Sequence, residues 1–404
     1  MNKESKMRLL IIQYAGDYRE SVQRFAEGKE ETYYAQKYSV NAVADIADKI
    51  EEAAVLCCMT EEPYNEVLSN EVRAIGAGFR DRVDVKRLLE IIAQFKPTHL
   101  IVRTAFRQIF QWAIKNKVPT IAMFAESISP GGGLKNKWRN YWLTKYLNHK
   151  QIKWVGSYGI GASKALEKFG VKPEKIVPWN FIVTENPAEF ETKSISGKEK
   201  DWTLFYIGSL IESKGVGDIL EALAHLRANN FPVRLKIAGQ DKTGVYHNKA
   251  KELQIEEFVE FMGLVPNSSV ISLMRDADVV LVPSHHEYPE GFPLAITHAL
   301  CARTPVIASD HPMFINHLKS EINAMIFPAG NAIALSSCVE KILTNPALYH
   351  KLSEASYETW KQLQMPVKWA DMINRWLDNS PENQQWLIEH CLSSGLYNSY
   401  QPAV

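Results

Sequence analysis

Short apolar runs recur along the first half of the chain, and segments with helical spacing lie between them. Runs of this length and composition predict strands that are buried on both faces. The predicted strands are Met7–Tyr14, Ala53–Met59, Thr98–Arg103, Val118–Phe124, Lys153–Gly156 and Lys175–Trp179. The predicted helices are Glu31–Ile50, Val85–Phe95, Ala105–Lys115, 134–153 and Ser163–Phe169. Because strands alternate with helices, the pattern predicts a parallel sheet that helices cover on both faces.

The same alternation is clearer in the second half of the chain. The predicted strands there are Trp202–Gly208, Val233–Gly239, Phe258–Gly263, Asp278–Pro283, Thr304–Ser309 and Asn323–Phe327. The helix expected after Gly215 carries an apolar stripe at helical spacing, which comprises Val216, Ile219, Leu220, Leu223 and Leu226. This half therefore predicts a second, doubly wound sheet. The weakly periodic segment Glu185–Lys200 predicts the linker before it.

Composition narrows the classes of protein. A chain of 404 residues exceeds the usual size of one domain, so two domains are expected. Lys+Arg and Asp+Glu both number 46, and this balance argues against a nucleic-acid partner. The five cysteines are scattered, and neither a signal-peptide pattern nor an apolar run of about 18 residues occurs. We therefore expect reduced thiols in a cytoplasmic protein that does not span a membrane.

The stretch from Asp278 to Leu300 holds the strongest candidate chemistry. It predicts a buried strand, then a polar loop, and then a helix that begins near Pro293. Gly291 lets the backbone approach a ligand closely, and the free amides of a helix start attract anions. Glu290 lies at the same helix start and can bind hydroxyl groups, although without these surroundings a solvated loop acid would be the better interpretation. The stretch is thus suited to a sugar joined to a diphosphate.

This stretch resembles the donor-site signature of retaining nucleotide-sugar glycosyltransferases of the GT-B fold, in glycosyltransferase family four. The resemblance implies an α/β chain of GT-B architecture, with two doubly wound Rossmann-like domains that face each other across a cleft. It implies an acceptor-binding domain at 1–185, a nucleotide-sugar donor-binding domain at 186–365, and a C-terminal helix at 366–404 that crosses back to the first domain. A break at Met365-Pro366 precedes that helix, whose Trp369, Ile373 and Trp376 can form its docking face.

The resemblance also implies the reaction. It implies transfer of a hexose, with glucose as the first guess, from a nucleoside diphosphate to an acceptor hydroxyl on a glycan or a lipid-linked glycan. UDP-glucose is the favoured donor, and no metal or other cofactor is expected. By resemblance Glu290 contacts the sugar, while Lys214 and the amides after Glu290 stabilise the diphosphate, so Glu290 and Lys214 are the expected catalytic residues. The remaining expected donor contacts are Gly16, Gly208, Ser209, Leu264, Val265, Ser284, His286, Gly291, Phe292, Pro293, Leu294 and His298.

Two positions depart from the family pattern. Ser209 replaces an arginine that would reach the diphosphate, and His298 replaces a glutamate that would hold the ribose. A neutral imidazole can still bind a ribose hydroxyl, or His298 can be a packing residue. Because histidine titrates near neutrality, we expect donor binding to vary between about pH 5.5 and 8 if His298 binds the ribose. The two losses leave open a non-catalytic sugar-nucleotide-binding protein, and a nucleotide-sugar epimerase is a third possibility.

Two patterns that suggest a metal site are assigned other roles. Asp276-Ala-Asp278 matches a motif of metal-dependent glycosyltransferases of another fold, but here it closes a helix and opens a strand, so capping and hydrogen bonding are expected. His285 and His286 are adjacent in a loop and tend to point apart, without a third ligand at suitable spacing. We therefore predict no metal site.

The first half offers candidates for acceptor binding. Arg103 and Glu126 follow predicted strands, where ligands meet a parallel sheet, but they can equally form a structural pair. The segment 134–153 carries six Lys or Arg and no Asp or Glu, together with aromatic residues such as Trp138 and Tyr141. Such a helix either contacts a membrane surface from the cytoplasmic side or packs its aromatic side on the sheet.

Overall fold

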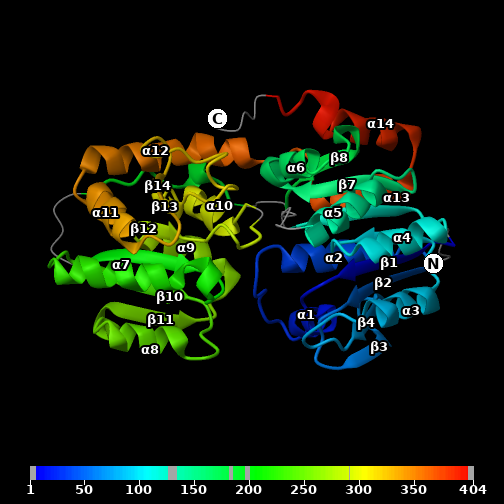
Figure 1. Cartoon of the computed structure of the whole chain (residues 1–404), viewed down its shortest axis with the longest axis horizontal. Helices are drawn as coiled ribbons and strands as arrows, with labels where there is room; N and C mark the ends of the chain where they lie inside the picture. The colour runs from blue at the N-terminus through cyan, green and yellow to red at the C-terminus, as the bar shows by residue number, and fades with distance from the viewer. Residues whose placement is uncertain (1–5, 126–133, 182–184, 196–200, 291, 399–404) are drawn as a thin grey trace. The chain divides into compact units, whose positions relative to one another are not determined.

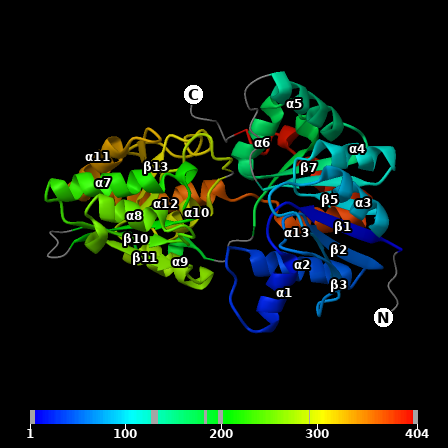
Figure 2. The same ribbon diagram turned by 60° about the horizontal axis from the view of Figure 1, so that its bottom comes forward.

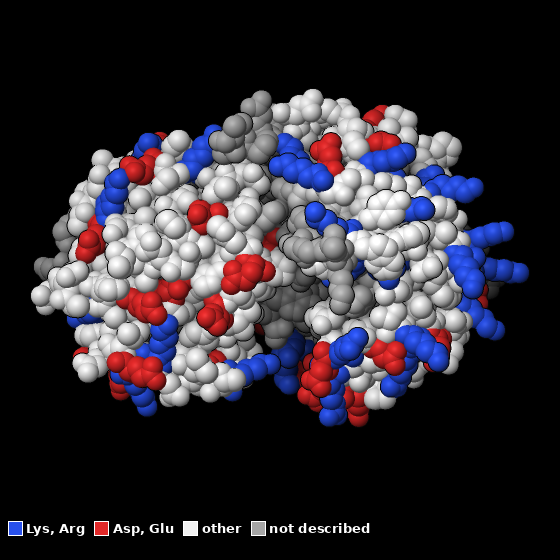
Figure 3. All heavy atoms as spheres, viewed as in Figure 1, with Lys and Arg blue, Asp and Glu red and all other residues white. Residues whose placement is uncertain are grey.

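The computed structural model describes residues 6–125, 134–181, 185–195, 201–290 and 292–398. Contacts divide the chain into two compact units. Unit 1 contains the chain up to Ile182 and again from Met365, and unit 2 contains Val183–Gln364. The expected boundaries lay at 185/186 and 365/366. The face drawn in Figure 3 carries Lys, Arg, Asp and Glu on each unit.

Unit 1 is built on an eight-stranded sheet with the order β3-β4-β2-β1-β5-β6-β7-β8 (Figure 1). The strands are β1 Arg8–Gln13, β2 Glu52–Cys57, β3 Pro63–Val67, β4 Arg73–Ala77, β5 His99–Val102, β6 Thr120–Phe124, β7 Ile152–Tyr158 and β8 Ile176–Trp179. Neighbouring strands are parallel except for β3 and β4. In the central strand β1, Leu9 and Ile11 enter one core, and the alternate residues Leu10 and Ile12 enter the other.

Helices cover both faces of this sheet (Figure 2). One face is packed by α1 Tyr18–Ala26, α2 Gln36–Ala47 and α13 Trp369–Asp378. The other face is packed by α3 Val85–Phe95, α4 Arg107–Lys115, α5 Leu134–Leu147 and α6 Gly159–Lys168. The remaining elements are α14 Pro381–Glu389 and the short turns η1 Pro173–Lys175 and η6 Leu392–Ser394.

The chain returns to unit 1 through α13. Its side chains Trp369, Ile373 and Trp376 are buried in the same core as Leu9 and Ile11 of β1. The return is fixed by backbone hydrogen bonds to Asn180, the residue after β8. The Asn180 amide donates to Val367 at 3.1 Å, and the Trp369 amide donates to Asn180 at 3.1 Å. The point where the chain leaves unit 1 therefore lies beside the point where it re-enters.

Unit 2 contains a six-stranded parallel sheet with the order β11-β10-β9-β12-β13-β14. The strands are β9 Trp202–Ile207, β10 Val233–Ala238, β11 Val259–Gly263, β12 Val279–Val282, β13 Val306–Ser309 and β14 Met325–Phe327. The helices are α7 Val216–Ala228, α8 Val245–Glu252, α9 Val270–Asp276, α10 Leu294–Cys301, α11 Ala332–Leu343 and α12 Pro346–Leu363. The short turns are η2 Pro187–Glu189, η3 Glu212–Lys214, η4 Glu256–Phe258 and η5 Asn267–Ser269.

The predicted stripe of α7 is buried against the sheet of unit 2, as its spacing indicated. Each strand predicted in this half is present at the expected place. The two doubly wound α/β units confirm the predicted fold class. In unit 1 the helix α1, the strands β3 and β4 and the short turns η1 and η6 were not predicted.

Candidate functional site

Three strands of unit 2 end in a tightly packed glycine cluster. The Gly208 amide, after β9, donates to the Ala238 carbonyl of β10 at 3.0 Å. The Gly239 amide, after β10, donates to the Gly263 carbonyl of β11 at 2.8 Å. A Cβ atom on Gly239 would lie 2.2 Å from the carbonyl oxygen of Gly208, so the close approach requires glycine there. The carboxyl edge of the sheet is therefore built from closely packed, half-buried backbone at these strands, which is where ligands of such sheets bind.

The loop after β9 is joined to the loop after β12. The His285 amide donates to the Ser213 carbonyl of η3 at 2.9 Å. Gly215 has φ +70°, and a Cβ atom there would lie 2.3 Å from the carbonyl oxygen of Pro283. Both the left-handed backbone and the contact require glycine. This packing holds Lys214, the residue before Gly215, above the loop that leads to Glu290.

The structure brings Lys214, Ser284 and Glu290 together. The Lys214 ammonium forms an ion pair with Glu290 Oε1, and the two side chains are only 15% and 7% exposed. Ser284 Oγ donates to the same oxygen at 2.7 Å. The ammonium also lies 4.0 Å from the ring centre of Tyr288. The cation expected at a diphosphate thus contacts the carboxylate expected at the sugar, so a bound diphosphate would compete with Glu290 for Lys214.

The histidines of this loop point to different partners, as their adjacency predicted. His285 Nε2 lies 2.7 Å from Asp218 of α7, and His286 Nε2 lies 2.7 Å from Asp310, which follows β13. Burial alone would lower the pKa of His285, but the hydrogen bond and charge of Asp218 raise it above the usual value. Among the described residues, no group of three or more His, Cys, Asp or Glu is placed to hold a metal ion.

His311, which follows β13, contacts the middle of the loop that follows β12. Its Nδ1 accepts from the Met313 amide at 3.2 Å, so Nε2 carries the proton and donates to the Tyr288 carbonyl at 3.1 Å. Burial lowers the pKa of His311. The neutral His311 ring therefore holds Tyr288 in place, and the ring of Tyr288 packs against the Lys214 ammonium.

Helix α10 begins near Pro293, as predicted. Leu294 is its first residue and Pro293 is the N-cap, so Pro293 lies before the helix and not in its first turn. No side chain caps this end. The Phe292 ring contacts the His317 ring edge-on, with 5.2 Å between ring centres. Gly291 lies outside the described residues.

His298 lies on α10 and is only 5% exposed. Burial lowers its pKa to about 4. The predicted change of donor binding between about pH 5.5 and 8 is therefore wrong, because a histidine with this pKa stays neutral throughout that range. The ribose contact of His298 stays a prediction, and it would be made by a neutral imidazole.

The other expected donor residues are spread over the carboxyl edge of unit 2, except for one. Ser209 follows Gly208, and its carbonyl accepts a hydrogen bond from the Tyr206 hydroxyl at 2.8 Å. Leu264 is exposed and Val265 half-buried, directly after β11. Gly16 lies in unit 1, after β1, so its donor contact stays a prediction.

The Asp276-Ala-Asp278 motif is structural. Asp276 is the last residue of α9, and the Asp278 carboxylate accepts from the Thr203 amide at 2.8 Å. The Asp278 contact agrees with the hydrogen bonding expected from the sequence, whereas the C-cap of α9 is Ala277 and not an aspartate.

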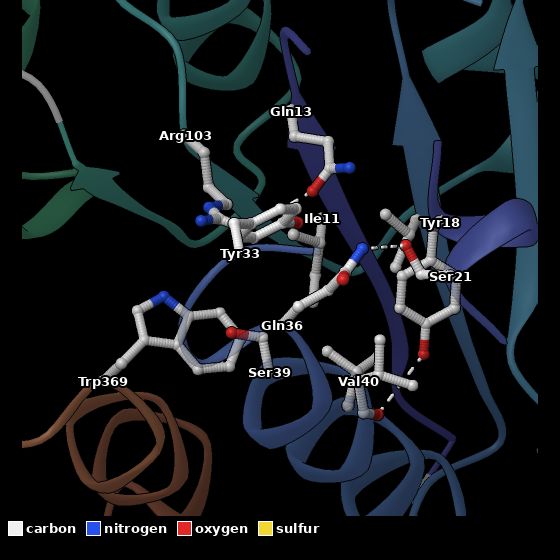
Figure 4. Close-up of a pocket in the computed structure, with 12 residues that line it drawn as sticks. Ile11, Gln13, Tyr18, Ser21, Tyr33, Gln36, Ser39, Val40, Arg103 and Trp369 are labelled. Carbon is white, nitrogen blue, oxygen red and sulfur yellow. Dashed lines mark hydrogen bonds between the residues drawn. The ribbon is translucent and has the colours of Figure 1, made fainter. Parts of the chain in front are cut away.

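Unit 1 has a cleft of about 840 Å³ at the carboxyl ends of β1, β5 and β6, with α4 and α5 as walls. Arg103 lines this cleft and also a smaller cavity of about 20 Å³, which Figure 4 draws with Tyr33 and Trp369 among its lining residues. Arg103 Nη1 donates to Gln13 Oε1 at 3.2 Å. Burial lowers the pKa of Arg103. Glu126, the other expected acceptor residue, lies outside the described residues.

Helix α5 divides its aromatic residues between core and surface. Leu143 and Leu147 are buried against the sheet, and Trp142 and Tyr146 are half-buried. Trp138 and Tyr141 are 56% and 62% exposed. The helix therefore packs on the sheet through one side and still presents two aromatic rings outward.

Sequence reasoning missed several residues that shape these two sites. Asp218 and Asp310 hold the two histidines, and Asp310 follows a predicted strand, which is a signal that could have identified it. Arg107 and Arg139 line the cleft of unit 1 from helices. The expectation that ligands bind at the carboxyl ends of strands does not identify residues on helices.

Comparison with known proteins finds similarity to the second unit of the chain. Residues 188–359 match the family described as "Glycosyl transferases group 1". The chain is 28% identical over 166 residues to the phosphatidyl-myo-inositol mannosyltransferase of Mycobacterium leprae, covering 41% of this chain and 43% of that protein. It is 23% identical over 205 residues to the amylovoran biosynthesis glycosyltransferase AmsK of Erwinia amylovora, covering 50% of this chain and 46% of that protein. The chain thus matches less than half the length of these relatives.

Solved structures resemble nearly the whole chain. Sucrose-phosphate synthase from Thermosynechococcus elongatus matches with a TM-score of 0.63 at 16% identity, covering 92% of this chain and 98% of that chain. HepE from Anabaena, solved in complex with UDP, matches with a TM-score of 0.61 at 13% identity and the same coverage. At this identity the likeness shows the fold, which is that of the GT-B glycosyltransferases.

Proposed function

We propose that the protein is a retaining glycosyltransferase that moves a hexose from a UDP-linked donor to a hydroxyl of a glycan or lipid-linked glycan. The observation that carries this proposal is the buried cluster of Lys214, Ser284 and Glu290 at the carboxyl edge of unit 2. The cluster lies within the region that matches group 1 glycosyltransferases. Glucose as the sugar and UDP as the carrier rest on resemblance to the family alone.

The cluster supports separate roles for Lys214 and Glu290 in the reaction. The bond between sugar C1 and the diphosphate oxygen breaks, the acceptor oxygen bonds to C1 on the same face, and the acceptor proton passes to the leaving phosphate. Lys214 turns from Glu290 to the departing diphosphate, where a cation in a partly buried site stabilises developing charge strongly. Glu290 keeps its hydrogen bond from Ser284 and accepts from the sugar hydroxyls. This proposed chemistry uses no metal.

The proposed acceptor reaches unit 1 from a membrane surface. The exposed Trp138 and Tyr141 of α5 accompany lysines along 134–153, a combination that favours anionic lipid headgroups. No helix in the described part of the chain is long and apolar enough to cross a membrane. We therefore propose peripheral contact from the cytoplasmic side.

The proposal is tested by incubating the purified chain with a panel of sugar nucleotides and measuring diphosphate release with and without glycan acceptors. Glu290→Gln should lower transfer by roughly 30- to 1,000-fold, which corresponds to about 2–4 kcal/mol of transition-state stabilisation. UDP affinity should not fall, because UDP carries no sugar. Glu287→Gln is the matched control, since Glu287 is an exposed acid of the same loop.

The outcomes separate the proposed enzyme from its rivals. Equal loss of transfer and UDP affinity in Glu290→Gln would contradict the assignment of Glu290. Tight UDP binding without diphosphate release would favour a non-catalytic sugar-nucleotide-binding protein, which the departures at Ser209 and His298 motivate. A changed sugar nucleotide in the absence of acceptor would favour an epimerase.

A further inference from the structure

The cleft of unit 1 is lined by four arginines from different parts of the chain. Arg103 follows β5, Arg107 begins α4, Arg139 lies on α5, and Arg82 precedes α3. The lining residues also include one acid, Asp81. Lys+Arg and Asp+Glu balance over the whole chain, so this concentration of cations is local. Charges of one sign on the walls of a cleft focus the potential inside it.

These arginines have no counterion in the described part of the chain. No described carboxylate lies within 4.0 Å of the four guanidinium groups. Arg103 has the neutral amide of Gln13 as partner, and Arg107 lies over the Trp138 ring, 4.6 Å from its centre. A guanidinium carries five N–H donors, so both side chains are positioned and still have donors for a ligand.

The chemistry of the arginine side chain indicates the ligand class. A guanidinium binds carboxylate and phosphate groups through two parallel hydrogen bonds, which a lysine ammonium cannot do. Arg103 and Arg107 are half-buried, and burial lowers the pKa of Arg103, so a cation without a counterion there is costly until an anion arrives. The volume of the cleft, about 840 Å³, is that of a typical small-molecule site.

We propose that this cleft binds an acceptor that carries an oxyanion, either a phosphate or a sugar carboxylate, and that Arg103, Arg107 and Arg139 hold that group. The inference rests on the proposed function, because the acceptor is the substrate that unit 1 would contribute. It adds the charge class of the acceptor, which the family resemblance leaves open.

Binding to the intact chain tests this inference without requiring turnover. Isothermal titration is run with UDP at saturation, so that the donor site is occupied, and the probes are inorganic pyrophosphate, glucuronate and neutral glucose. The wild type should bind pyrophosphate or glucuronate more tightly than glucose. The double variant Arg107→Gln, Arg139→Gln should weaken that binding by about 10- to 100-fold, because hydrogen bonds to charged groups are lost.

A matched control is available in the same unit. Arg87 also lies over an aromatic ring, 5.9 Å from the centre of Phe79, but it does not line the cleft. Arg87→Gln should leave anion binding unchanged, and thermal melting should show that both variants remain folded. Preference for pyrophosphate would identify a phosphate-bearing acceptor, and preference for glucuronate a sugar acid.

Two results would overturn the inference. One is equal affinity for glucose and both anions, and the other is unchanged anion affinity in the double variant. If anion binding depends on the arginines but no sugar nucleotide releases diphosphate, the proposed function fails while the anion site stands. If transfer occurs and the arginines do not matter for anion binding, the proposed function stands without this inference.

Discussion

Replacing Gly215 with alanine should destabilise unit 2 more than the same change at Gly244. The two glycines have nearly equal φ, +70° and +71°, and each precedes a helix. Forcing alanine into this left-handed region costs about 1–2 kcal/mol at either position. At Gly215 the new Cβ would also lie 2.3 Å from the carbonyl oxygen of Pro283, whereas no atom lies within 4 Å at Gly244. Such crowding typically adds about 1–3 kcal/mol.

The clash can be relieved only if η3 moves away from the end of β12, which carries Lys214 away from Glu290. Hydrogen exchange followed by mass spectrometry measures this, because it resolves peptides of unit 2 from those of unit 1. Peptides that contain 211–215 and 279–285 should exchange faster in Gly215→Ala than in Gly244→Ala. Equal exchange in the two variants, with equal melting temperatures, would refute the claim that this contact holds the cluster together.

Three further predictions concern individual side chains of unit 2. Burial lowers the pKa of His298 from 6.5 to about 4, so the unfolded chain binds more protons between these values. The unfolding free energy should therefore fall by up to about 3 kcal/mol from pH 6.5 to 4. Denaturant titrations at several pH values should show that the unfolding free energy of His298→Gln lacks this contribution to the pH dependence. Lys214→Ala should weaken UDP by about 10- to 100-fold but uridine much less in calorimetry, because Lys214 would contact only the diphosphate. Lys193 Nζ donates to the carbonyl of Arg275 at 2.7 Å and to that of Ala277, so Lys193→Met should lower the unfolding free energy by about 1–3 kcal/mol in urea titrations.

The elements that were predicted are those with strong periodicity. The strands of unit 2 are short apolar runs, and the stripe of α7 repeats at helical spacing, so both are evident in the sequence. Helix α1 was missed because its start depends on one carboxylate, that of Asp17, which accepts from the Arg19 and Glu20 amides. The hairpin of β3 and β4 was missed because β3 is almost wholly exposed and lacks an apolar run.

The residues of the candidate site could be named from the sequence, but their contacts could not. Glu290 and Lys214 belong to recognisable motifs 76 positions apart. Their pairing depends on how closely Gly215 approaches Pro283, which is a tertiary contact. The pKa of His298 depends on how completely α10 is buried, and the sequence indicates a helix there without indicating that depth.

The interruption of unit 1 by unit 2 has a consequence for the order in which the chain folds on the ribosome. Unit 2 ends at Gln364, so all of it is synthesised before α13 and its tryptophans emerge. Because Trp369, Ile373 and Trp376 complete the core around β1, unit 1 cannot finish folding until α13 has been synthesised, after all of Val183–Gln364. Unit 1, whose synthesis begins before that of unit 2, therefore completes its core only after unit 2 has been made. Until then the face of its sheet that α13 will cover is open to chaperones and to other nascent chains.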